Sequence, residues 1–345
     1  MRWIIGWAIG WAVLGCGDDD GGPVDTAGED VAAFEDGAED ASAGDDAPAT
    51  DDAPPAEDAA ETTDHVGPGE PDECLAPGAD WVFCSSFEEG DFGVWDDYDG
   101  NPPETNVLLE DPGPAGLAGN HVARLRVPPG RGGADLVKVL PGEYDRLYAR
   151  WYVRWEPGYD FDAPNHGGGL HAGSRDYLGR SDYRPDGTDW FGAWLEPVAI
   201  PAYGHVLNVY SYYRGMYMDC ADPSGSCWGD HFPCMVDEGA TYCERPEHRE
   251  TTVPPDLETG RWYCLELLVD GGTPSATEAG AGGTLDWWID GLEIGPWTPL
   301  WFRTTAELRL TILWLSLFHH EEHSVEGLYL DNVVVGTSRI GCLGD

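Results

Sequence analysis

The residues whose types and spacing most readily suggest chemistry lie in the stretch 316–324, SLFHHEEHS. Three histidines and two glutamates this close together suit a metal site, a catalytic corner or a solvated polar turn. The spacing is not H-E-x-x-H and no helical period precedes it, which excludes the arrangement of a zinc protease. We expect neither a metal nor a cofactor, and metal binding by this turn stays open as an alternative.

The strand expected before these histidines, 308–318, carries two different rows of side chains, because successive residues of a strand face opposite sides. One row is apolar and should face the core: Leu313, Leu315 and Leu317. The other mixes aromatic and polar groups: Trp314, Ser316, Phe318 and His320. His319 continues the leucine row. His320 therefore lies at the end of a cleft if the mixed row lines one.

A second mixed row follows from the segment HVLNVYSYY at 205–213. Asn208, Tyr210 and Tyr212 share one face of the expected strand, while Leu207 and Val209 occupy the other. Aromatic rings stack on the apolar C–H faces of a sugar, and planar polar groups bind its hydroxyls. The chain holds 16 Trp and 15 Tyr, and structural packing is the alternative use of each. This row predicts a carbohydrate cleft.

The elements that must position these residues are short β-strands. Apolar and β-branched runs recur between Gly, Pro, Asp and Asn, and no long segment has a helical period. The expected strands are 81–87, 120–127, 134–140, 147–155, 190–196, 205–213, 262–269, 284–290, 308–318 and 328–335. Asp290-Gly291 between apolar residues predicts a hairpin turn. The pattern predicts an all-β sandwich or jelly roll.

The N-terminal 73 residues have a different character. Residues 1–15 hold one Arg and a short apolar run, typical of a signal peptide, and Val13-Leu14-Gly15-Cys16 resembles a bacterial lipobox with Cys16 as the lipidated residue. An ordinary secretory signal is the alternative. Residues 17–73 contain 21 acidic residues and no Lys or Arg. Such a segment is expected to be a disordered linker after Cys16, which leaves one domain, 74–345.

Charge and cysteine usage limit the partners and the compartment. The chain has a net charge of −46, which excludes nucleic acid as a partner because that binding depends on neutralising phosphates. Apart from Cys16 there are eight cysteines, an even number that predicts up to four disulfides outside the cytoplasm. Their connectivity stays open. The four cysteines within 220–243 lack a C-x₂₋₄-C pair, which favours a disulfide-bonded loop over a zinc site.

Several segments together resemble the family-14 polysaccharide lyases, the alginate and glucuronan lyase-like proteins. They are LYARWYVRWEPGYDF (147–161), NHGGGLHAG (165–173), DWFGAW (189–194), the Tyr-x-Tyr strand, GRWYCLELLV (260–269), WWIDGLEIG (287–295) and LYLDNVVVGTSRIG (328–341). The resemblance covers about 81–341. It implies a concanavalin A-type jelly roll and cleavage of a uronate-containing glycan by β-elimination.

The resemblance also implies roles for individual residues. Tyr210 and Tyr212 match the family's Tyr-x-Tyr strand, where a phenol acts as base and acid. Where the family has a loop lysine this chain has His166, and near its strand arginine it has Trp194. The substrate carboxylate is then expected beside His166, His171 and Arg175. Other expected substrate contacts are Asn208, Trp194, Trp314, His320 and Arg150.

The sequence thus predicts an envelope-anchored, monomeric lyase-like protein that binds polysaccharide and is held to a membrane by an N-terminal lipid. A lectin-like module that binds glycan without cleaving it is the alternative. A purely structural surface lipoprotein is a third possibility.

Overall fold

The computed structural model describes residues 72–98, 106–127, 132–162, 165–181, 183–217, 228–234, 252–319 and 326–344. The predicted signal peptide, Cys16 and nearly all of the acidic linker lie outside these residues, as do His320 and His323. Within the described part, no helix is long and apolar enough to cross a membrane.

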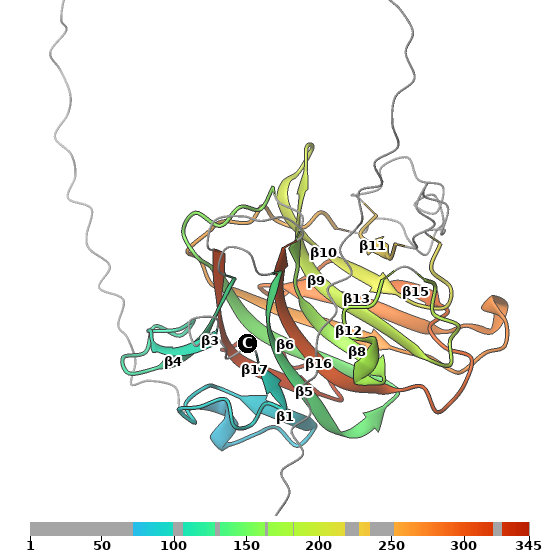
Figure 1. The fold of residues 1–345 in the computed structure, drawn as a ribbon, viewed down its shortest axis with the longest axis horizontal. Helices are drawn as coiled ribbons and strands as arrows, with labels where there is room; N and C mark the ends of the chain where they lie inside the picture. The colour runs from blue at the N-terminus through green and yellow to red at the C-terminus, as the bar shows by residue number, and fades with distance from the viewer. Residues whose placement is uncertain are drawn as a thin grey trace, which may run out of the picture. The chain divides into compact units, whose positions relative to one another are not determined.

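Two antiparallel β-sheets form the domain (Figure 1). Sheet A has nine strands, in the order β14 (Leu292–Glu293), β13 (Gly283–Ile289), β12 (Tyr263–Asp270), β6 (Arg146–Trp155), β17 (Glu326–Gly336), β4 (His121–Val127) and β3 (Asn106–Glu110). In addition, β1 (Trp81–Ser85) pairs with β17, and β15 (Trp297–Leu300) pairs with β13.

Sheet B has eight strands and carries the predicted cleft residues. Its order is β11 (Asp230–Phe232), β10 (Gly204–Tyr212), β9 (Trp190–Ile200), β8 (Gly168–Gly173), β16 (Leu310–His319), β5 (Gly133–Tyr144) and β2 (Asp97–Tyr98), with β7 (Asn165–His166) paired to β16. Among the described residues, short 3₁₀ helices lie in the loops at Glu73–Leu75, Arg175–Tyr177 and Glu278–Gly280.

The all-β jelly-roll prediction is confirmed, and a strand occurs at each of the ten predicted positions. The Asp290-Gly291 hairpin is also confirmed. It joins β13 to β14, and both residues have positive φ, 50° and 77°. Such a turn twists in the same sense as its strands, which explains the Asp-Gly pair. The strands that the sequence pattern missed are short or glycine-rich, such as β8.

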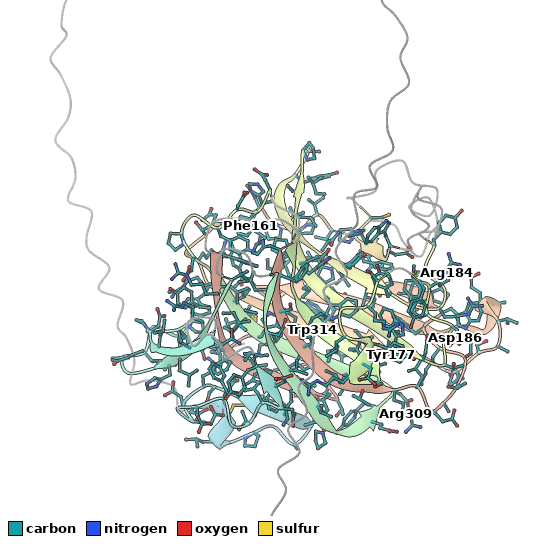
Figure 2. All side chains as sticks on the ribbon, in the orientation of Figure 1. Phe161, Tyr177, Arg184, Asp186, Arg309 and Trp314 are labelled. Atoms are coloured by element: carbon teal, nitrogen blue, oxygen red, sulfur yellow. A yellow bond between two sulfur atoms is a disulfide. The ribbon has the colours of Figure 1, made fainter. Side chains whose placement is uncertain are left out.

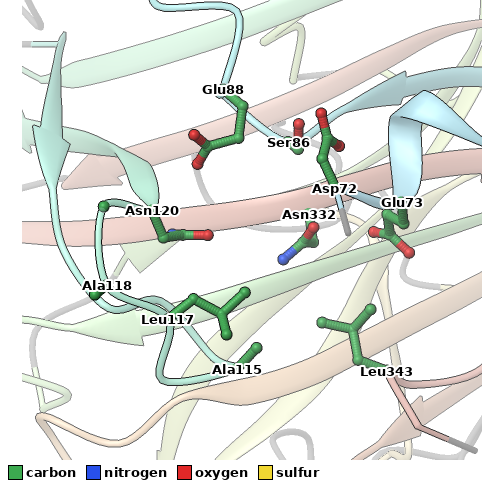
Figure 3. Close-up of a pocket in the computed structure, with 11 residues that line it drawn as sticks. Asp72, Glu73, Ser86, Glu88, Ala115, Leu117, Ala118, Asn120, Asn332 and Leu343 are labelled. Atoms are coloured by element: carbon green, nitrogen blue, oxygen red, sulfur yellow. The ribbon is translucent and has the colours of Figure 1, made fainter. Parts of the chain in front are cut away.

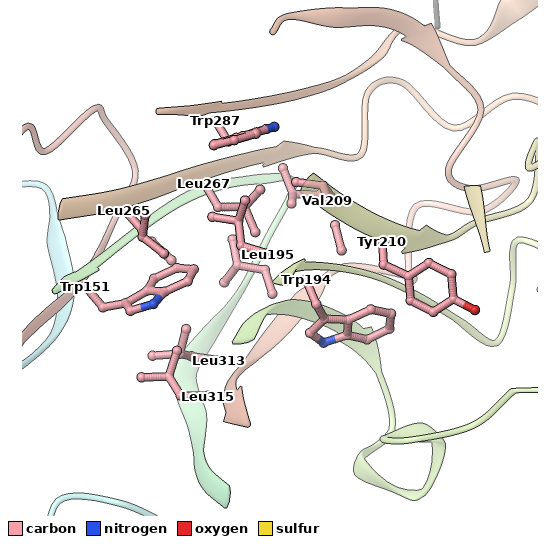
Figure 4. Close-up of a cluster of buried hydrophobic side chains, with 14 of the residues drawn as sticks. Trp151, Trp194, Leu195, Val209, Tyr210, Leu265, Leu267, Trp287, Leu313 and Leu315 are labelled. Carbon is pink, nitrogen blue, oxygen red and sulfur yellow. The ribbon is translucent and has the colours of Figure 1, made fainter. Parts of the chain in front are cut away.

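The core lies between the two sheets, where the apolar rows face each other. Leu147, Ala149, Trp151, Val153 and Trp155 of β6 are buried in it, as are Leu313, Leu315 and Leu317 of β16. Leu195 and Val209 point into the core, whereas Trp194 and Tyr210 leave the opposite side of their strands (Figure 4). Each fully buried apolar side chain contributes about 1.5–3 kcal/mol, so this alternation fixes which face of sheet B remains for other uses.

Disulfides join Cys74 to Cys84 and Cys264 to Cys342. The second connects β12 to the C-terminal segment that follows β17. Cys234 is disulfide-bonded as well. These bonds bear out the prediction that the cysteines form disulfides.

Candidate functional site

One row of side chains crosses sheet B from edge to edge on the face turned away from the core. Direct cross-strand pairing joins its members in the order His231, Tyr210, Trp194, Gly169, Trp314, Val137 and Asp97. Partners that lie directly opposite in an antiparallel pair project to the same side. The two predicted rows of β10 and β16 therefore belong to one continuous surface, which we call the outer face of sheet B.

A close pair of titratable groups on this face is His166 of β7 and Glu196 of β9. His166 Nδ1 lies 2.6 Å from Glu196 Oε2. Glu196 is only 3% exposed, so its carboxylate relies on this partner. Burial lowers the pKa of His166, but the hydrogen bond and charge of Glu196 outweigh burial and raise it above 6.5. The pair holds the imidazole in one orientation at the surface.

Tyr210 lies between two imidazole rings. Its ring stacks on His166, with centroids 5.4 Å apart and planes 13° apart, and it lies 4.9 Å from the His231 ring. Its hydroxyl is 2.9 Å from the Tyr212 hydroxyl and accepts a hydrogen bond from the Gly229 N–H. Burial, together with the neighbouring Tyr212 phenol, raises the pKa of Tyr210 far above 10. Tyr210 is therefore a protonated phenol at neutral pH.

Asn208 completes this cluster on the same strand. Its side chain is buried, and its amide lies 3.2 Å from His231 Nδ1. Asn208 also pairs across the strands with Glu196. The structure thus brings together three of the predicted residues, His166, Asn208 and Tyr210. We call these three with Glu196 and His231 the histidine–tyrosine cluster.

Tyr212 and His171 lie deeper than the sequence led us to expect. Tyr212 packs against Trp190, which also contacts His171, Tyr177 and Tyr183. These rings form a second aromatic layer between sheet B and the loop 174–189. His171 is fully buried, and burial lowers its pKa to about 4 despite a contact with the Ser174 carbonyl. A neutral imidazole under this loop cannot neutralise a substrate carboxylate.

The two tryptophans of the row meet edge to face. Trp194 and Trp314 have ring centroids 6.0 Å apart at an interplanar angle of 86°. Trp194 is almost buried, whereas Trp314 is half-buried and donates from Nε1 to Asp135 Oδ1 at 3.0 Å. Trp314, labelled in Figure 2, belongs to β16 and pairs across the strands with Gly169 of β8. Of the two rings, Trp314 offers the larger accessible surface for stacking.

The two predicted arginines lie away from the cluster. Arg175 pairs with Asp97 of β2, at the opposite end of the row from Tyr210. Arg150 belongs to sheet A and is 1% exposed, with its guanidinium bonded to the Glu73 carboxylate and the Asn332 carbonyl. Arg150 therefore has no access to the outer face of sheet B, and its assignment as a substrate contact is corrected. His320 lies outside the described residues.

Sequence analysis missed Glu196 and His231. A signal for Glu196 exists, because it lies two residues after Trp194 and so shares its face. A carboxylate on that face, among aromatic residues, needs a buried partner, and a histidine is the natural choice. His231 gives no such signal, because β11 is only three residues long.

Comparisons with known proteins support the fold. No family model matches this chain, and no curated protein does. Alginate lyase vAL-1 from Chlorella virus superposes with a TM-score of 0.52 at 12% identity, covering 75% of this chain and 100% of that one. The marine PL-14 alginate lyase from Aplysia kurodai has a TM-score of 0.48 at 12% sequence identity, and the match covers 75% of this chain and 97% of that one. Alginate lyase Aly36B has a TM-score of 0.48 at 14% sequence identity, and the match covers 76% of this chain and 95% of that one. The similarity to vAL-1 establishes a shared jelly-roll fold and, at 12% sequence identity, nothing beyond the fold.

Proposed function

We propose that this protein is a polysaccharide lyase that cleaves a uronate-containing glycan by β-elimination. The observation that supports this most directly is the histidine–tyrosine cluster, in which an imidazole held by Glu196 stacks on a protonated phenol. Base and acid then lie side by side on a face lined with aromatic rings. The fold shared with alginate lyase vAL-1 is compatible with the same reaction class.

β-Elimination requires three catalytic groups around one sugar residue. A base removes the C5 proton, an acid protonates the departing oxygen at C4, and a third group stabilises the charge that develops on the carboxylate. The C4–O bond breaks as the C4=C5 double bond forms. The two products are an unsaturated sugar end and a free hydroxyl, without any water being added.

The pKa shifts of Tyr210 and His166 support an assignment of the acid and the base. Tyr210 keeps its proton at neutral pH, so it is the acid. Burial lowers the pKa of His166, but Glu196 outweighs it and raises this pKa above 6.5, which makes the neutral imidazole a stronger base. We therefore assign His166 as the base, with Glu196 stabilising the imidazolium that forms. The Tyr212 hydroxyl, 2.9 Å from that of Tyr210, can return a proton to it. This assignment changes the sequence prediction, in which a tyrosine served as both base and acid.

Asn208 and His231 are our candidates for holding the carboxylate. An amide and an imidazole lie together beside Tyr210, and donors placed near developing charge stabilise the transition state. Arg175 lies at the far end of the row, so we assign it to a more distant part of the glycan. Trp314 is proposed as the stacking surface between the two.

A non-catalytic carbohydrate-binding module is the second candidate, and one observation favours it. The hydroxyls of Tyr210 and Tyr212 bond to each other, and both rings are almost buried. A phenol engaged in this way must exchange a partner before it can protonate a glycan. A binding module would keep the aromatic row without needing that exchange.

The deciding experiment is an absorbance screen against alginate, glucuronan and other uronate polymers. A lyase generates unsaturated ends that absorb in the ultraviolet, whereas a binding module retards the same polymers in affinity gels without forming product. Absence of both signals across the panel would contradict both candidates and favour a structural role.

The envelope anchor is a separate proposal. It is supported by the lipobox-like sequence that ends at Cys16. Incorporation of labelled fatty acid into the wild type, but not into Cys16→Ser, is the expected result in a bacterial host. Equal labelling of both proteins would contradict the anchor and leave the lyase proposal untouched.

A further inference from the structure

Sheet B, which carries the histidine–tyrosine cluster, is poor in positive charge. Its eight strands contain a single Lys or Arg residue, Lys138 of β5. Lys138 lies opposite Leu313, which faces the core. Its ammonium group donates to the Val94 carbonyl and lies 3.0 Å from Asp96 Oδ2. Within the described part of the chain, the strands of sheet B therefore present no permanent cation to the outer face.

The two arginines predicted to contact the substrate are engaged elsewhere. Arg175 pairs with Asp97 at the far end of the row from Tyr210. Arg150 belongs to sheet A and donates to the Glu73 carboxylate. Glu73 forms part of the wall of a cavity of about 200 Å³ beside that sheet (Figure 3). Neither arginine therefore neutralises a carboxylate that is bound at the cluster.

Carboxylates lie on the outer face of sheet B instead. Asp97 ends the row. Glu196 and Asp135 lie two residues from Trp194 and Val137 of the row, so each shares its neighbour's side of the strand. A uronate polymer carries a carboxylate on each uronic acid residue and would meet negative charge along this face.

This repulsion is greatest in the form of the site that is ready to react. A general base must be neutral before it accepts a proton. When His166 is neutral, its ring no longer offsets the charge of Glu196, which is 3% exposed and therefore poorly screened by water. Asn208, the proposed contact of the sugar carboxyl group, lies directly opposite Glu196 across the strands. The reactive form of the site thus disfavours an ionised carboxyl group at Asn208.

Beyond the cluster, the same face of β9 and β10 becomes apolar. Val198 and Val206 occupy the next positions on this face after Glu196 and Asn208, and they pair directly with each other. Together with Ile200 they form a small apolar group apart from the main core. Val198 is half-buried, so part of its side chain remains open to contact with a ligand.

We propose that the substrate of this site is an esterified uronate, in which the sugar to be cleaved carries a methyl ester in place of a free carboxylate. This inference rests on the lyase function proposed above. An ester has no charge for Glu196 to repel. Its carbonyl oxygen accepts hydrogen bonds from Asn208 and His231, and its methyl group contacts Val198.

An ester also suits the uncharged donors of the cluster during the reaction. When His166 takes the C5 proton, an ester becomes an enolate with one negative charge, whereas a carboxylate becomes a dianion. Amide and imidazole N–H groups stabilise a single developing charge without a cation. The C4–O bond then breaks as the C4=C5 double bond forms, and Tyr210 protonates the departing oxygen. The ester bond stays intact, so the products are an unsaturated uronate ester and a free hydroxyl.

The experiment compares the free acid with the methyl ester of the same polymer. Alginate, glucuronan and polygalacturonate are each assayed in both forms near neutral pH, by the ultraviolet absorbance of unsaturated ends and against enzyme-free blanks. For the polymer that is cleaved, kcat/KM should be at least about tenfold higher for the ester. Raising the ionic strength from about 0.05 to 0.5 M should speed cleavage of the free acid, because screening weakens the repulsion, and should leave cleavage of the ester unchanged.

Val198 and Ala199 provide a matched pair of variants, because adjacent residues of β9 face opposite sides. Val198→Arg adds a cation on the face of the cluster, and Ala199→Arg adds the same charge at an exposed position on the other side. Val198→Arg should reduce the ratio of ester to free-acid kcat/KM about tenfold or more. Ala199→Arg should keep the wild-type ratio. Melting temperatures of both variants show whether they fold, and the comparison of polymers with the wild type does not depend on them.

The possible failures can be told apart. If the wild type cleaves the free acid as fast as the ester or faster, the preference for an ester is overturned and the proposed lyase function stands. An unchanged ratio in a folded Val198→Arg variant would contradict the placement of the ester beside Val198. If no polymer yields unsaturated ends in either form, the proposed lyase function itself fails, and this inference fails with it.

Discussion

His166 and Glu196 are 30 residues apart in the chain, yet His166 Nδ1 lies 2.6 Å from Glu196 Oε2. The two residues come from β7 and β9, and the hydrogen bond joins a half-exposed imidazole to a buried carboxylate. This contact gives the outer face of sheet B an oriented, titratable group beside Tyr210. Replacement of Glu196 should show whether that orientation matters for the reaction.

Glu196→Gln should move the pH dependence of the proposed lyase toward lower pH. If neutral His166 is the base, activity of the wild type rises as pH passes upward through the His166 pKa. Glu196 raises that pKa and burial lowers it, so removing the carboxylate leaves burial to bring the pKa down. We also expect the maximal rate to fall about tenfold or more, because the ring loses its partner.

The readouts are the pH–rate profile and an NMR titration of His166. Glu196→Asp serves as the control, because it keeps the charge and should recover part of the wild-type profile. If the acidic limb of the pH–rate profile is the same in Glu196→Gln as in the wild type, Glu196 has no role in the mechanism.

Tyr210→Phe and Tyr212→Phe should differ in severity. Loss of the proposed acid should reduce the formation of unsaturated ends about 10²–10⁴-fold. Tyr212 lies in the aromatic layer with Trp190 and touches the reaction only through its bond to the Tyr210 hydroxyl. We therefore expect a loss of about tenfold or less for Tyr212→Phe. Full activity in Tyr210→Phe would contradict the assignment of the acid.

Trp314→Ala should weaken binding of glycan more than it slows catalysis. The ring is half-buried in the row and lies two strands from Trp194. Stacking is lost while the histidine–tyrosine cluster stays intact, so KM should rise with little change in kcat. The measurement is retardation in affinity gels alongside steady-state kinetics. Trp262→Ala, at a half-buried tryptophan beside sheet A, is the matched control and should retain wild-type binding.

The stability of the protein should depend on the ionisation of Asp331. This residue of β17 is fully buried, and its carboxylate accepts hydrogen bonds from Asn120 and from the Asn332 N–H. Burial raises the pKa of this carboxyl from 3.8 to about 7 in the folded protein. A pKa raised by folding means that the contribution to stability is complete below about pH 4 and is lost as pH rises through about 7.

Asp331→Asn should remove this dependence. The melting temperature of the wild type relative to the variant should therefore decrease from pH 4 to pH 8. Comparing the two proteins cancels the opposite trend from His171, whose pKa is lowered to about 4 and whose burial destabilises the fold on acidification. A difference that stays constant with pH would show that Asp331 does not titrate in this range.

Within the histidine-rich stretch 319–323, the residue that the structure describes is His319. His319 follows the leucine row into a buried position against Tyr159, as the alternation predicts. His320 and His323 lie outside the described residues, so the three alternatives for that turn stay open. The histidines that do meet the phenol are His166 and His231, which are far from that stretch in the chain.

The sequence alone determined the class of fold and the two faces of each long strand. A period of two fixes which side chains lie together on one strand, and burial of the apolar row decides which face turns inward. That reasoning correctly placed Asn208, Tyr210 and Tyr212 on one side of their strand, and Trp314 and Phe318 together on one side of theirs. It required only local information.

Only the tertiary structure decided which of these faces meet, and at which register. Cross-strand pairing set Tyr210 beside Trp194 and His231, and it put Arg150 on the other sheet. Local alternation carries no information on strand order, because hydrogen bonds between strands form over long sequence separations. Whether a charged group is exposed, paired or buried depends on those partners. For that reason Glu196 and Asp331 acquired their significance only in the folded protein.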